Sequence, residues 1–456
     1  MRARAARLGA RPGHCAIVSL PSPQDPVATL FERELFGIKL GLDNIRALCD
    51  ALDHPELACP TVIVAGTNGK GSVTALVAAA LSAAGFRTAR YTSPHLVRLE
   101  ERFALDGRVV EPSDLRRAAR TVLDAEAAAS QRGRLEVPAT FFELTTAVAF
   151  VLFHTMGADV AVLEVGLGGR FDATNAASPA AGVITNVDFD HTKHLGPTLA
   201  DIAFEKAGII RPAMTVVHGA RAREAAQVIA QTAAARGARL VDAFDGVTAM
   251  VELAGGRTWL DLTTPGRAYG RLPLALQGRH QADNAVVAVR LLEALAPHGL
   301  EVGPAAIVSG LTTAYWPGRL DLRAAAGGRR VLLDAAHNPA GAATLASYLG
   351  EVWPGGVPIV FGAMRDKDVT SMFRTLAPAA TRFVFTRPAT PRARPARDLL
   401  DVYEGLGLPV PAMQADPPAR AIELAFGDGD LAVVAGSIFL VGEVLTLGGI
   451  GPPIHP

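Results

Sequence analysis

The sequence predicts an α/β protein with two parallel-sheet domains, the second smaller than the first. Three observations support this fold class. The chain has 456 residues, which is too long for one ordinary core. Short runs of β-branched and other apolar residues alternate with longer Ala/Leu-rich periodic segments, the pattern of parallel strands covered by helices on both faces. A glycine-rich turn, GTNGKGS, follows the first such run and leads into a helical segment.

Four apolar runs predict the strands of the first domain, and periodic segments predict its helices. The strands are expected at 61–65, 160–165, 181–187 and 214–219. The helices are expected at 72–84, 140–153 and 280–295. Residues 239–275 alternate in polarity and turn often, which predicts a small antiparallel insert.

A second α/β series begins near residue 328. Its strands are expected in the segments RRVLLDA, VPIVFGAM, TRFVFTRP and DLAVVAGS. The joint lies around GLTTAYWPGRLD. We therefore predict domains at 27–312 and 320–456, joined by a linker at 313–319.

Residues 1–26 form a separate leader that is rich in Arg and Ala. It lacks the apolar run of a secretory signal. A mitochondrial-type presequence is one interpretation and a disordered extension is the other. The disordered extension is favoured because four prolines would interrupt an amphipathic helix: Pro12, Pro21, Pro23 and Pro26.

Composition excludes several classes of protein. A formal net charge of zero argues against a general binder of nucleic acid or anionic membranes. No apolar stretch reaches the ~18 uncharged residues of a membrane span. The three cysteines, an odd number crowded before residue 60, make neither a disulfide framework nor a metal cluster. A cytoplasmic location is the simplest interpretation.

The turn GTNGKGS departs from the usual phosphate-loop pattern, G-x-x-x-x-G-K-[ST]. Val64 stands where the first glycine should fall, and Gly71 stands where the hydroxyl should. However, a turn between a buried strand and a helix directs backbone N–H groups to one point, and the helix dipole adds positive potential. A structural turn with a surface lysine is the alternative. The flanking elements favour phosphate binding, with Lys70 as a mobile charge.

Two further polar residues follow predicted strands. Ser93 precedes a proline in YTSPHLVRLEER and, taken alone, is typical of a turn serine. Glu164 closes an apolar strand, at the carboxyl edge where doubly wound folds bind ligands. Near a phosphate loop, such a carboxylate could hold Mg²⁺ or position water; otherwise it is a charge facing solvent.

The segment TNVDFDHTKHLG offers four side chains able to ligate a metal: Asp188, Asp190, His191 and His194. Because Mg²⁺ prefers oxygen ligands, an ordinary polar loop is the alternative. Lys206 follows in an apolar helical segment. It either extends its ammonium to the surface or is a desolvated, reactive amine with a lowered pKa.

In the second domain, VLLDAAHNPAG repeats the order of strand, polar turn and helix. Asp334 and His337 lie at its tip, and Asn338 before Pro339 suits a helix N-cap. Arg319, in WPGRLD, lies at the domain joint, where a guanidinium could cross a cleft to a phosphate.

Together and in this order, these segments resemble the folylpolyglutamate synthase/dihydrofolate synthase family within the ATP-dependent Mur-type ligases. The resemblance spans about Phe36 to Gly442 and rests on eight blocks: AGTNGKGS, YTSPHLVRLEER, LEVGLGGRFDATN, DHTKHLG, EKAGI, PGRL, DAAHNP and AGSIFLV. It implies a phosphate-loop NTPase-like ATP-binding domain and a smaller Rossmann-like glutamate-ligase domain. TFFE and GLGGRFDATN look more like the bacterial bifunctional enzymes.

The resemblance also implies cofactors and site residues. The cofactors are ATP, Mg²⁺ and a carbamate formed by CO₂ on Lys206, and a monovalent cation is compatible with them. The residues matching the nucleotide site are Thr67, Asn68, Gly69, Lys70, Gly71, Ser72, Asn284, Arg319 and Asp334. Those matching the magnesium site are Ser93, Glu164, His191 and Lys206. Lys70, Lys206, His191 and Arg319 would act in catalysis.

The implied substrates are dihydropteroate, reduced folates and L-glutamate. The pterin pocket would be formed by 36–42 together with Thr140, Phe141, Phe142, Glu143, Phe171, Asp172 and Ala173. His337 and Ser437 match positions near the incoming glutamate. The expected reaction passes through an acyl phosphate, in a monomer that binds neither nucleic acid nor membrane.

Two other functions would account for parts of the sequence. A different Mur-type ligase would join another acid to another amine, but wall-precursor enzymes carry a substrate domain before the loop, and only about 35 residues precede it here once the leader is set aside. A non-catalytic nucleotide-binding switch would need only the loop around Lys70. It would leave Glu164, His191 and Lys206 unexplained.

Overall fold

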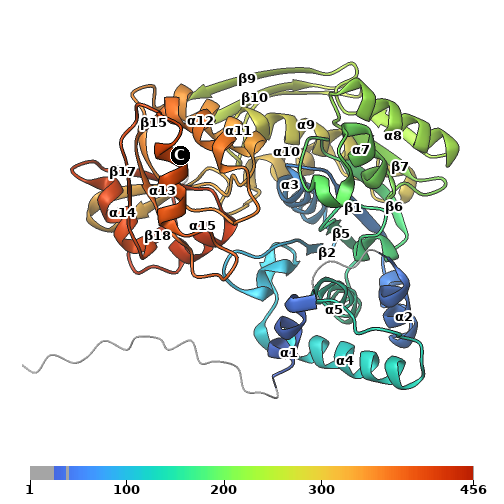
Figure 1. Cartoon of the computed structure of the whole chain (residues 1–456). Coiled ribbons are helices and arrows are strands. Elements are labelled where there is room, and N and C mark those ends of the chain that lie inside the picture. The colour runs from blue at the N-terminus through green and yellow to red at the C-terminus, as the bar shows by residue number, and fades with distance from the viewer. Residues whose placement is uncertain (1–24, 37–40, 455–456) are drawn as a thin grey trace, which may run out of the picture.

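The computed structural model describes residues 25–36 and 41–454, which form two α/β units (Figure 1). The predicted leader therefore lies outside the described residues, except for its last two positions. Those two belong to the fold: Asp25 caps helix α1 (Pro26–Glu32), and Pro26 is buried. The predicted leader boundary is wrong at this point, because Pro26 occupies the first turn of a helix, where its missing N–H leaves no bond unmade.

The first unit is built on an eight-stranded sheet in the order β4-β3-β2-β5-β1-β6-β7-β8. Its strands are β1 (Thr61–Ala65), β2 (Thr88–Tyr91), β3 (Phe103–Leu105), β4 (Arg108–Val109), β5 (Val160–Glu164), β6 (Pro179–Ile184), β7 (Thr215–His218) and β8 (Arg239–Asp242). Six neighbouring strands of this sheet, β2-β5-β1-β6-β7-β8, run parallel. Strands β3 and β4 add an antiparallel edge beside β2. The carboxyl ends of the parallel strands therefore meet at one edge.

Helices cover both faces of this sheet, as Figure 1 shows with α3 and α5 on opposite sides. The helices of this unit that follow α1 are α2 (Asp43–Ala51), α3 (Lys70–Ala83), α4 (Pro112–Gln131), α5 (Phe141–Thr155), α6 (Thr192–Leu195), α7 (Leu199–Ala207), α8 (Arg223–Ala235), α9 (Arg279–Glu293) and α10 (Pro304–Thr313). Alternate residues of β1 serve the two faces. Val62 and Val64 pack with α3, α9 and α10, whereas Ile63 and Ala65 pack with α7 and α8.

The predicted antiparallel insert is smaller than expected. Strands β9 (Thr248–Ala254), β10 (Arg257–Thr263) and β11 (Ala268–Pro273) form a separate antiparallel sheet. Strand β8, which was included in the prediction, instead extends the main sheet parallel to β7. It is a half-exposed edge strand, so its alternating polarity looks like that of an antiparallel hairpin.

The second unit carries a seven-stranded sheet in the order β16-β15-β14-β17-β13-β12-β18. Its strands are β12 (Asp321–Ala325), β13 (Arg329–Leu333), β14 (Val357–Phe361), β15 (Ala380–Phe385), β16 (Ala412–Gln414), β17 (Leu431–Ala435) and β18 (Ile450–Pro453). Its helices are α11 (Pro339–Val352), α12 (Val369–Leu376), α13 (Ala396–Glu404), α14 (Pro418–Phe426) and α15 (Ile438–Leu445). Five neighbouring strands, β16-β15-β14-β17-β13, run parallel. Residues 314–320 connect α10 of the first unit to β12 of the second.

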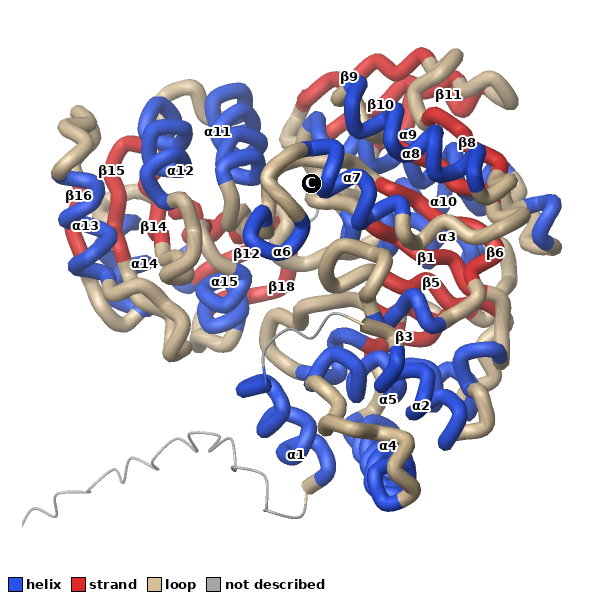
Figure 2. The backbone as a smooth tube through the Cα atoms, turned by 45° about the vertical axis from the view of Figure 1, so that its right-hand side comes forward, coloured by secondary structure: helices blue, strands red, loops and turns tan. Residues whose placement is uncertain are grey.

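The two units touch on the side where α6 lies (Figure 2).

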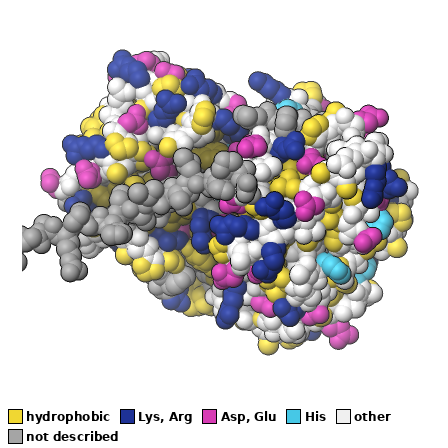
Figure 3. All heavy atoms as spheres, turned by 90° about the horizontal axis from the view of Figure 1, so that it is seen from below, with side chains coloured by type: hydrophobic (Ala, Val, Ile, Leu, Met, Phe, Trp, Pro, Cys, Tyr) yellow, Lys and Arg dark blue, Asp and Glu magenta, His cyan; other side chains and the backbone are white. Residues whose placement is uncertain are grey.

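Of the helices in the described ranges, none has the length and apolarity needed to cross a membrane. On the face drawn in Figure 3, basic and acidic side chains are interspersed outside the grey atoms. This agrees with the formal net charge of zero.

Candidate active site

The glycine-rich turn lies between β1 and α3, at the carboxyl edge of the sheet. Gly69 caps α3 with φ +80°, a left-handed conformation that suits glycine. The backbone N–H groups of Thr67 and Asn68 donate to Asn186 Oδ1, at 3.2 and 2.8 Å. The Thr67 hydroxyl is hydrogen-bonded to the backbone of Asp188. The turn is therefore fixed against the loop after β6, and the N-terminus of α3 remains directed at the edge.

Helix α9 packs against the other side of this turn. A Cβ at Gly69 would collide with Asn284 Oδ1, and one at Gly71 would lie 2.6 Å from the Trp316 ring. Gln281 Nε2 donates to Ser72 Oγ at 3.2 Å, and Asn284 Nδ2 donates to Gln281 Oε1 at 2.9 Å. The predicted nucleotide residues Asn284 and Ser72 thus belong to one contiguous cluster, in which the Ser72 hydroxyl is taken up by Gln281.

Two lysines meet at the carbonyl group of Gly66. Lys206 is buried in α7 and donates to Gly66 O at 2.9 Å, so its ammonium does not extend to the surface. Lys70 Nζ donates to the same oxygen and to Thr67 O, each at 3.1 Å. Burial, assisted by the charge of Lys70, lowers the pKa of Lys206 to about 7. Of the two readings of the sequence, the desolvated amine is the one that fits.

The side chains expected to hold Mg²⁺ begin with Glu164, which is buried at the end of β5. Its Oε2 accepts from Ser93 N at 3.1 Å, so Ser93 stands beside it. Burial raises the pKa of Glu164, and the charge of Lys70 opposes this rise. One carboxylate with a nearby serine hydroxyl, close to a phosphate site, fits the Mg²⁺ habit of using few protein oxygens and the phosphates of a bound nucleotide.

His191 is the N-cap residue of α6. Its backbone is left-handed, with φ +51°, and burial lowers its pKa, as do the charges of Lys70 and Lys206. Nowhere in the described ranges do three or more His, Cys, Asp or Glu side chains gather as a metal site would require. A magnesium site would therefore depend on Ser93 and on the phosphates as well as on Glu164 and His191.

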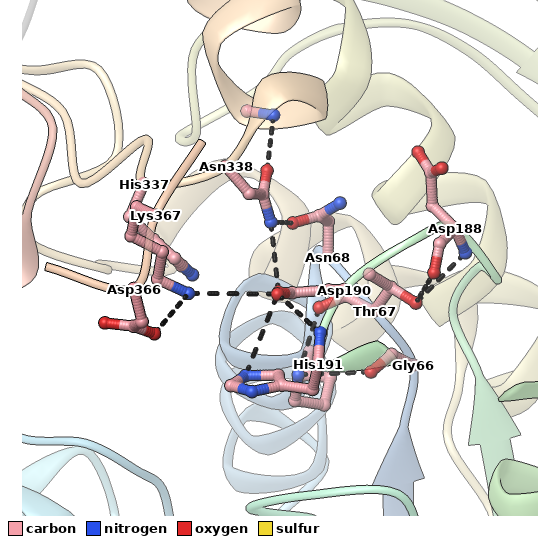
Figure 4. Close-up of polar contacts among 12 residues, drawn as sticks. Gly66, Thr67, Asn68, Asp188, Asp190, His191, His337, Asn338, Asp366 and Lys367 are labelled. Atoms are coloured by element: carbon pink, nitrogen blue, oxygen red, sulfur yellow. Dashed lines mark hydrogen bonds and ion pairs between the residues drawn. The ribbon is translucent and has the colours of Figure 1, made fainter. Parts of the chain in front are cut away.

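Asp190, next to His191, joins the two units (Figure 4). Its Oδ2 accepts from Asn338 Nδ2 at 3.2 Å, and its Oδ1 lies 3.8 Å from Lys367 Nζ. Asn338 Nδ2 also donates to Asn68 Oδ1 at 3.2 Å, which connects the second unit to the glycine-rich turn. Burial alone would raise the pKa of Asp190, but His191 and Lys367 hold it below its ordinary value. Asp190 is therefore an anion that organises both units.

The second unit contributes further predicted residues to the same region. Asp334 is buried, and its two oxygens accept from Leu320 N and Ala336 N, each at 2.9 Å. Burial raises the pKa of Asp334, and the charge of Arg319 opposes the rise. Burial also lowers the pKa of His337 to about 4, and its Nδ1 lies 2.9 Å from Ala335 O. His337 is therefore a neutral imidazole at physiological pH, and its Nδ1–H donates to that carbonyl.

Ser437 lies at the start of α15 in the second unit. It is buried, and its Oγ accepts from Phe439 N at 3.1 Å as the N-cap. Its hydroxyl hydrogen remains available as a donor at this helix terminus.

Comparisons with known proteins agree with this arrangement. The Mur ligase middle domain family matches residues 64–292, and the Mur ligase glutamate ligase domain family matches residues 318–438. A Bacillus subtilis relative named dihydrofolate synthase/folylpolyglutamate synthase is 32% identical, over 92% of this chain and 98% of its own length. The chain belongs to the dihydrofolate synthase/folylpolyglutamate synthase family of Mur ligases.

Solved structures of this family superimpose over nearly the whole chain. Mycobacterium tuberculosis folylpolyglutamate synthase complexed with ADP has a TM-score of 0.86 and 33% identity, and the match covers 94% of this chain and 100% of that one. Escherichia coli FolC in complex with DHPP and ADP has a TM-score of 0.79 and 29% identity, with 93% and 97% covered. The two-domain α/β architecture is thus confirmed as that of the family.

The residues that the family resemblance places at the pterin lie on the opposite face of the sheet from α3. Thr140 caps α5, and Glu143 Oε2 accepts from Thr140 N and Oγ1 at 2.8 and 2.9 Å. Glu143 Oε1 is buried and has no hydrogen-bond partner among the described residues. Phe141 stacks on Phe31 with ring centroids 5.5 Å apart, and Phe142 lies against Gly166. Residues 37–40 of the predicted 36–42 segment lie outside the described residues.

Asp172 organises the turn after β5. It accepts from Gly166 N and Leu167 N, both at 2.9 Å, and from Thr174 N at 3.0 Å. Ala173 is buried in the same apolar cluster as Phe141. Phe171 is 36% exposed, and Arg170 Cζ lies 4.2 Å from its ring centroid. Among these three residues, Phe171 has the side chain most open to a substrate.

Sequence reasoning missed several contacts of the site. Asn186, Gln281, Trp316 and Lys367 were not predicted. Asn186 and Lys367 lie in the loops that follow β6 and β14, past the carboxyl ends of these parallel strands, and polar residues in such loops are a signal that could have found them. Gln281 and Trp316 act through packing against α3, which has no local signature.

Proposed function

We propose that this chain is an ATP-dependent ligase that joins L-glutamate to dihydropteroate, to reduced folates, or to both, through an acyl phosphate. The observation that carries the proposal is the meeting of Lys70, Lys206 and Glu164 at one sheet edge, facing Asn338 and Lys367 of the second unit. A phosphate site of this kind between two domains suits the activation of an acid followed by attack of an amine. The names of the relatives, together with DHPP in the solved E. coli complex, support the choice of substrates.

In the first step, the carboxylate of the acid substrate attacks the γ-phosphate of ATP, and ADP leaves. The N-terminus of α3 and Lys70 hold the phosphates, and Arg319 lies close enough to Glu164 and Asp334 to reach the same region. Phosphoryl transfer depends mainly on such positioning and charge. When bound by Glu164, Ser93 and His191, Mg²⁺ would offset the negative charge of the phosphates.

We also propose that Lys206 carries a carbamate. The neutral amine adds to CO₂ and releases one proton, which converts a buried cation into an anion. A pKa of about 7 leaves a large share of the amine neutral at physiological pH, as this addition requires. The neighbouring ammonium of Lys70, bonded to the same Gly66 carbonyl, would then gain an anionic partner.

In the second step, the amine of L-glutamate attacks the acyl phosphate. The carbon–nitrogen bond forms, phosphate leaves with the electron pair, and the nitrogen gives up a proton. The Nε2 of His337 is an unprotonated acceptor, because Nδ1–H is directed to Ala335 O. It is therefore suited to orient the incoming amine. Asn338 and Lys367 hold the second unit against the first while this occurs.

The test is to incubate the purified protein with ATP, Mg²⁺, L-glutamate and each pterin substrate, and to analyse the products by mass spectrometry. We expect one ADP for each new amide, with release dependent on both the acid and the amino acid. ADP release without any glutamyl product, with dihydropteroate and with each reduced folate, would refute the proposal.

A further inference from the structure

A cavity of about 490 Å³ extends along the flank of α3, away from the glycine-rich turn. At one end it is lined by Ser93, Glu164 and Arg319, so it is continuous with the reaction centre. Its wall is formed by the small side chains of α3, including Ala75 and Ala79. The cavity lies on the α3 face of the sheet, whereas the residues assigned to the pterin lie on the α5 face.

Arg90, on β2, places a guanidinium group in this cavity. Among the described residues, its buried Nε has no hydrogen-bond partner and its guanidinium has no ion pair; the charge of Glu164 acts on it from beyond ion-pair distance. Its Cζ lies 5.1 Å from the Trp316 ring centroid, and Trp316 is itself fixed against Gly71. A desolvated guanidinium without an anion is costly in free energy. The cation–π contact with Trp316 limits the positions that the guanidinium can take, which suits a prepared carboxylate site.

The carboxylates that line the same cavity are already occupied. Glu101 accepts from Leu96 N at 2.7 Å and from Arg98 N at 3.0 Å. Asp106 Oδ1 accepts from Thr88 N at 2.8 Å. Glu164 accepts from Ser93 N and belongs to the reaction centre. None of these groups forms an ion pair with Arg90; the charge of Glu164 acts on its guanidinium, but Glu164 also faces Lys70 and Arg319. A carboxylate in direct contact with Arg90 is therefore left for a ligand to supply.

We propose that Arg90 binds the second carboxylate of a glutamyl residue at the end of the acid substrate. This inference rests on the proposed function. A terminal glutamyl residue has two carboxylates: one is activated at the phosphate site, and the other remains an anion a few bonds away. Dihydropteroate has only one. Arg90 therefore determines how well the site accepts acids that already carry glutamate, and does so from the face of the sheet opposite the pterin residues.

The test compares Arg90→Met, Arg90→Lys and the parent protein with two acids, dihydropteroate and tetrahydrofolate monoglutamate. The control is Arg87→Met, which removes an exposed arginine three residues earlier on the chain. For Arg90→Met we expect the ratio of KM for the glutamylated acid to KM for dihydropteroate to rise about 10- to 100-fold, the effect of losing one charge-assisted hydrogen bond. Arg90→Lys should restore part of the loss, and Arg87→Met should leave the ratio at the parent value.

Three results would overturn the inference. An unchanged ratio would mean that Arg90 does not contact the tail. A rise in the KM of L-glutamate with both acids would place the incoming amino acid at Arg90 instead. Turnover of dihydropteroate with no turnover of any glutamylated acid by the parent protein would leave the proposed ligase intact but remove the need for this subsite. Loss of turnover with both acids in the parent would instead count against the ligase itself.

Discussion

Lys70 and Lys206 donate to one and the same acceptor, the carbonyl oxygen of Gly66, at 3.1 and 2.9 Å. Two ammonium groups at one carbonyl repel each other, and Lys206 is the more deeply buried of the two. Lys70 has a second acceptor in Thr67 O. These facts favour Lys206 over Lys70 as the amine that would carry the proposed carbamate.

Replacing Lys206 should remove an anion from the site without disturbing the nucleotide loop. For Lys206→Ala we expect kcat to fall about 10²–10³-fold, the range for loss of one preorganised electrostatic group. The affinity for ATP should change little, because the turn is held independently by Asn186. Added short carboxylates such as formate should restore part of the rate. An unchanged kcat would refute the role of the carbamate, and ¹³C NMR with labelled bicarbonate would detect the modification directly.

The pKa of Lys206 also predicts a pH dependence. Carbamate formation consumes the neutral amine, which predominates above a pKa of about 7 and decreases tenfold for each pH unit below it. At a fixed concentration of dissolved CO₂, kcat should therefore fall as the pH drops from 8 to 6. The measurement is the pH–rate profile of the parent protein beside Lys206→Ala, whose residual rate should lack this limb. If both proteins show the same limb, another group is responsible.

The sequence predicted the framework of the fold well because the framework is encoded locally. The run TVIVA coincides with β1 because its four consecutive apolar residues, Val62 to Ala65, suit a strand in the middle of a sheet, which is buried on both faces. Strand β8 was assigned to the wrong sheet because four half-exposed residues carry no information about their partner strand. Which strand lies beside another is decided by the tertiary fold, not by the local sequence of either strand.

The difference between local sequence signals and contacts made only in the tertiary fold also explains which parts of the site could be predicted. Lys70, Glu164 and Lys206 stand out as polar residues beside glycines or within apolar segments, which is unusual enough to be noticed along the chain. Gln281 and Trp316 do not. They act by packing onto Ser72 and Gly71 from segments more than 200 residues away, and neither residue type is unusual where it occurs. That Arg90 has no ion pair among the described residues likewise depends on which neighbours the fold brings to it.

Glu164 should control the response to Mg²⁺. Glu164→Gln keeps an oxygen for the Ser93 N–H group but removes the negative charge, so the Mg²⁺ concentration needed for half-maximal rate should rise and kcat/KM for ATP should fall about 10²-fold or more. The control is Glu126→Gln, which alters a buried carboxylate bonded to Arg33 and Ala139 N, in the helical layer. It should affect stability without changing the Mg²⁺ titration. Identical titrations for the two variants would contradict the assignment of Glu164.

The pair of Asp190 and Lys367 should couple the two domains. Both side chains are only 14% exposed, so their interaction is weakly screened by solvent. A double-mutant cycle with Asp190→Asn and Lys367→Met should give a coupling free energy in the transition state of about 0.5–3 kcal/mol, as for residues in direct contact. A second ion pair between the domains, Arg279–Glu351, is 52% and 33% exposed and serves as the matched control. Its cycle should give only about 0–1 kcal/mol, and equal values for both pairs would show that Asp190 has no special role.

Gly69 should be required for nucleotide binding, and for a steric reason that does not apply to Gly85 at the other end of α3. Gly69 and Gly85 flank the two ends of α3 with positive φ, +80° and +95°, so alanine at either position carries a backbone strain of about 1–2 kcal/mol. Only at Gly69 would the new methyl group also meet a neighbour, the side chain of Asn284; at Gly85 there is open space. Thermal unfolding should therefore shift downward for both variants. ADP affinity, measured by calorimetry, should fall at least tenfold for Gly69→Ala alone, because the methyl group displaces Asn284 or the turn itself. An equal affinity in the two variants would mean that the turn adapts to the methyl group, and that the contact with Asn284 does not set its shape.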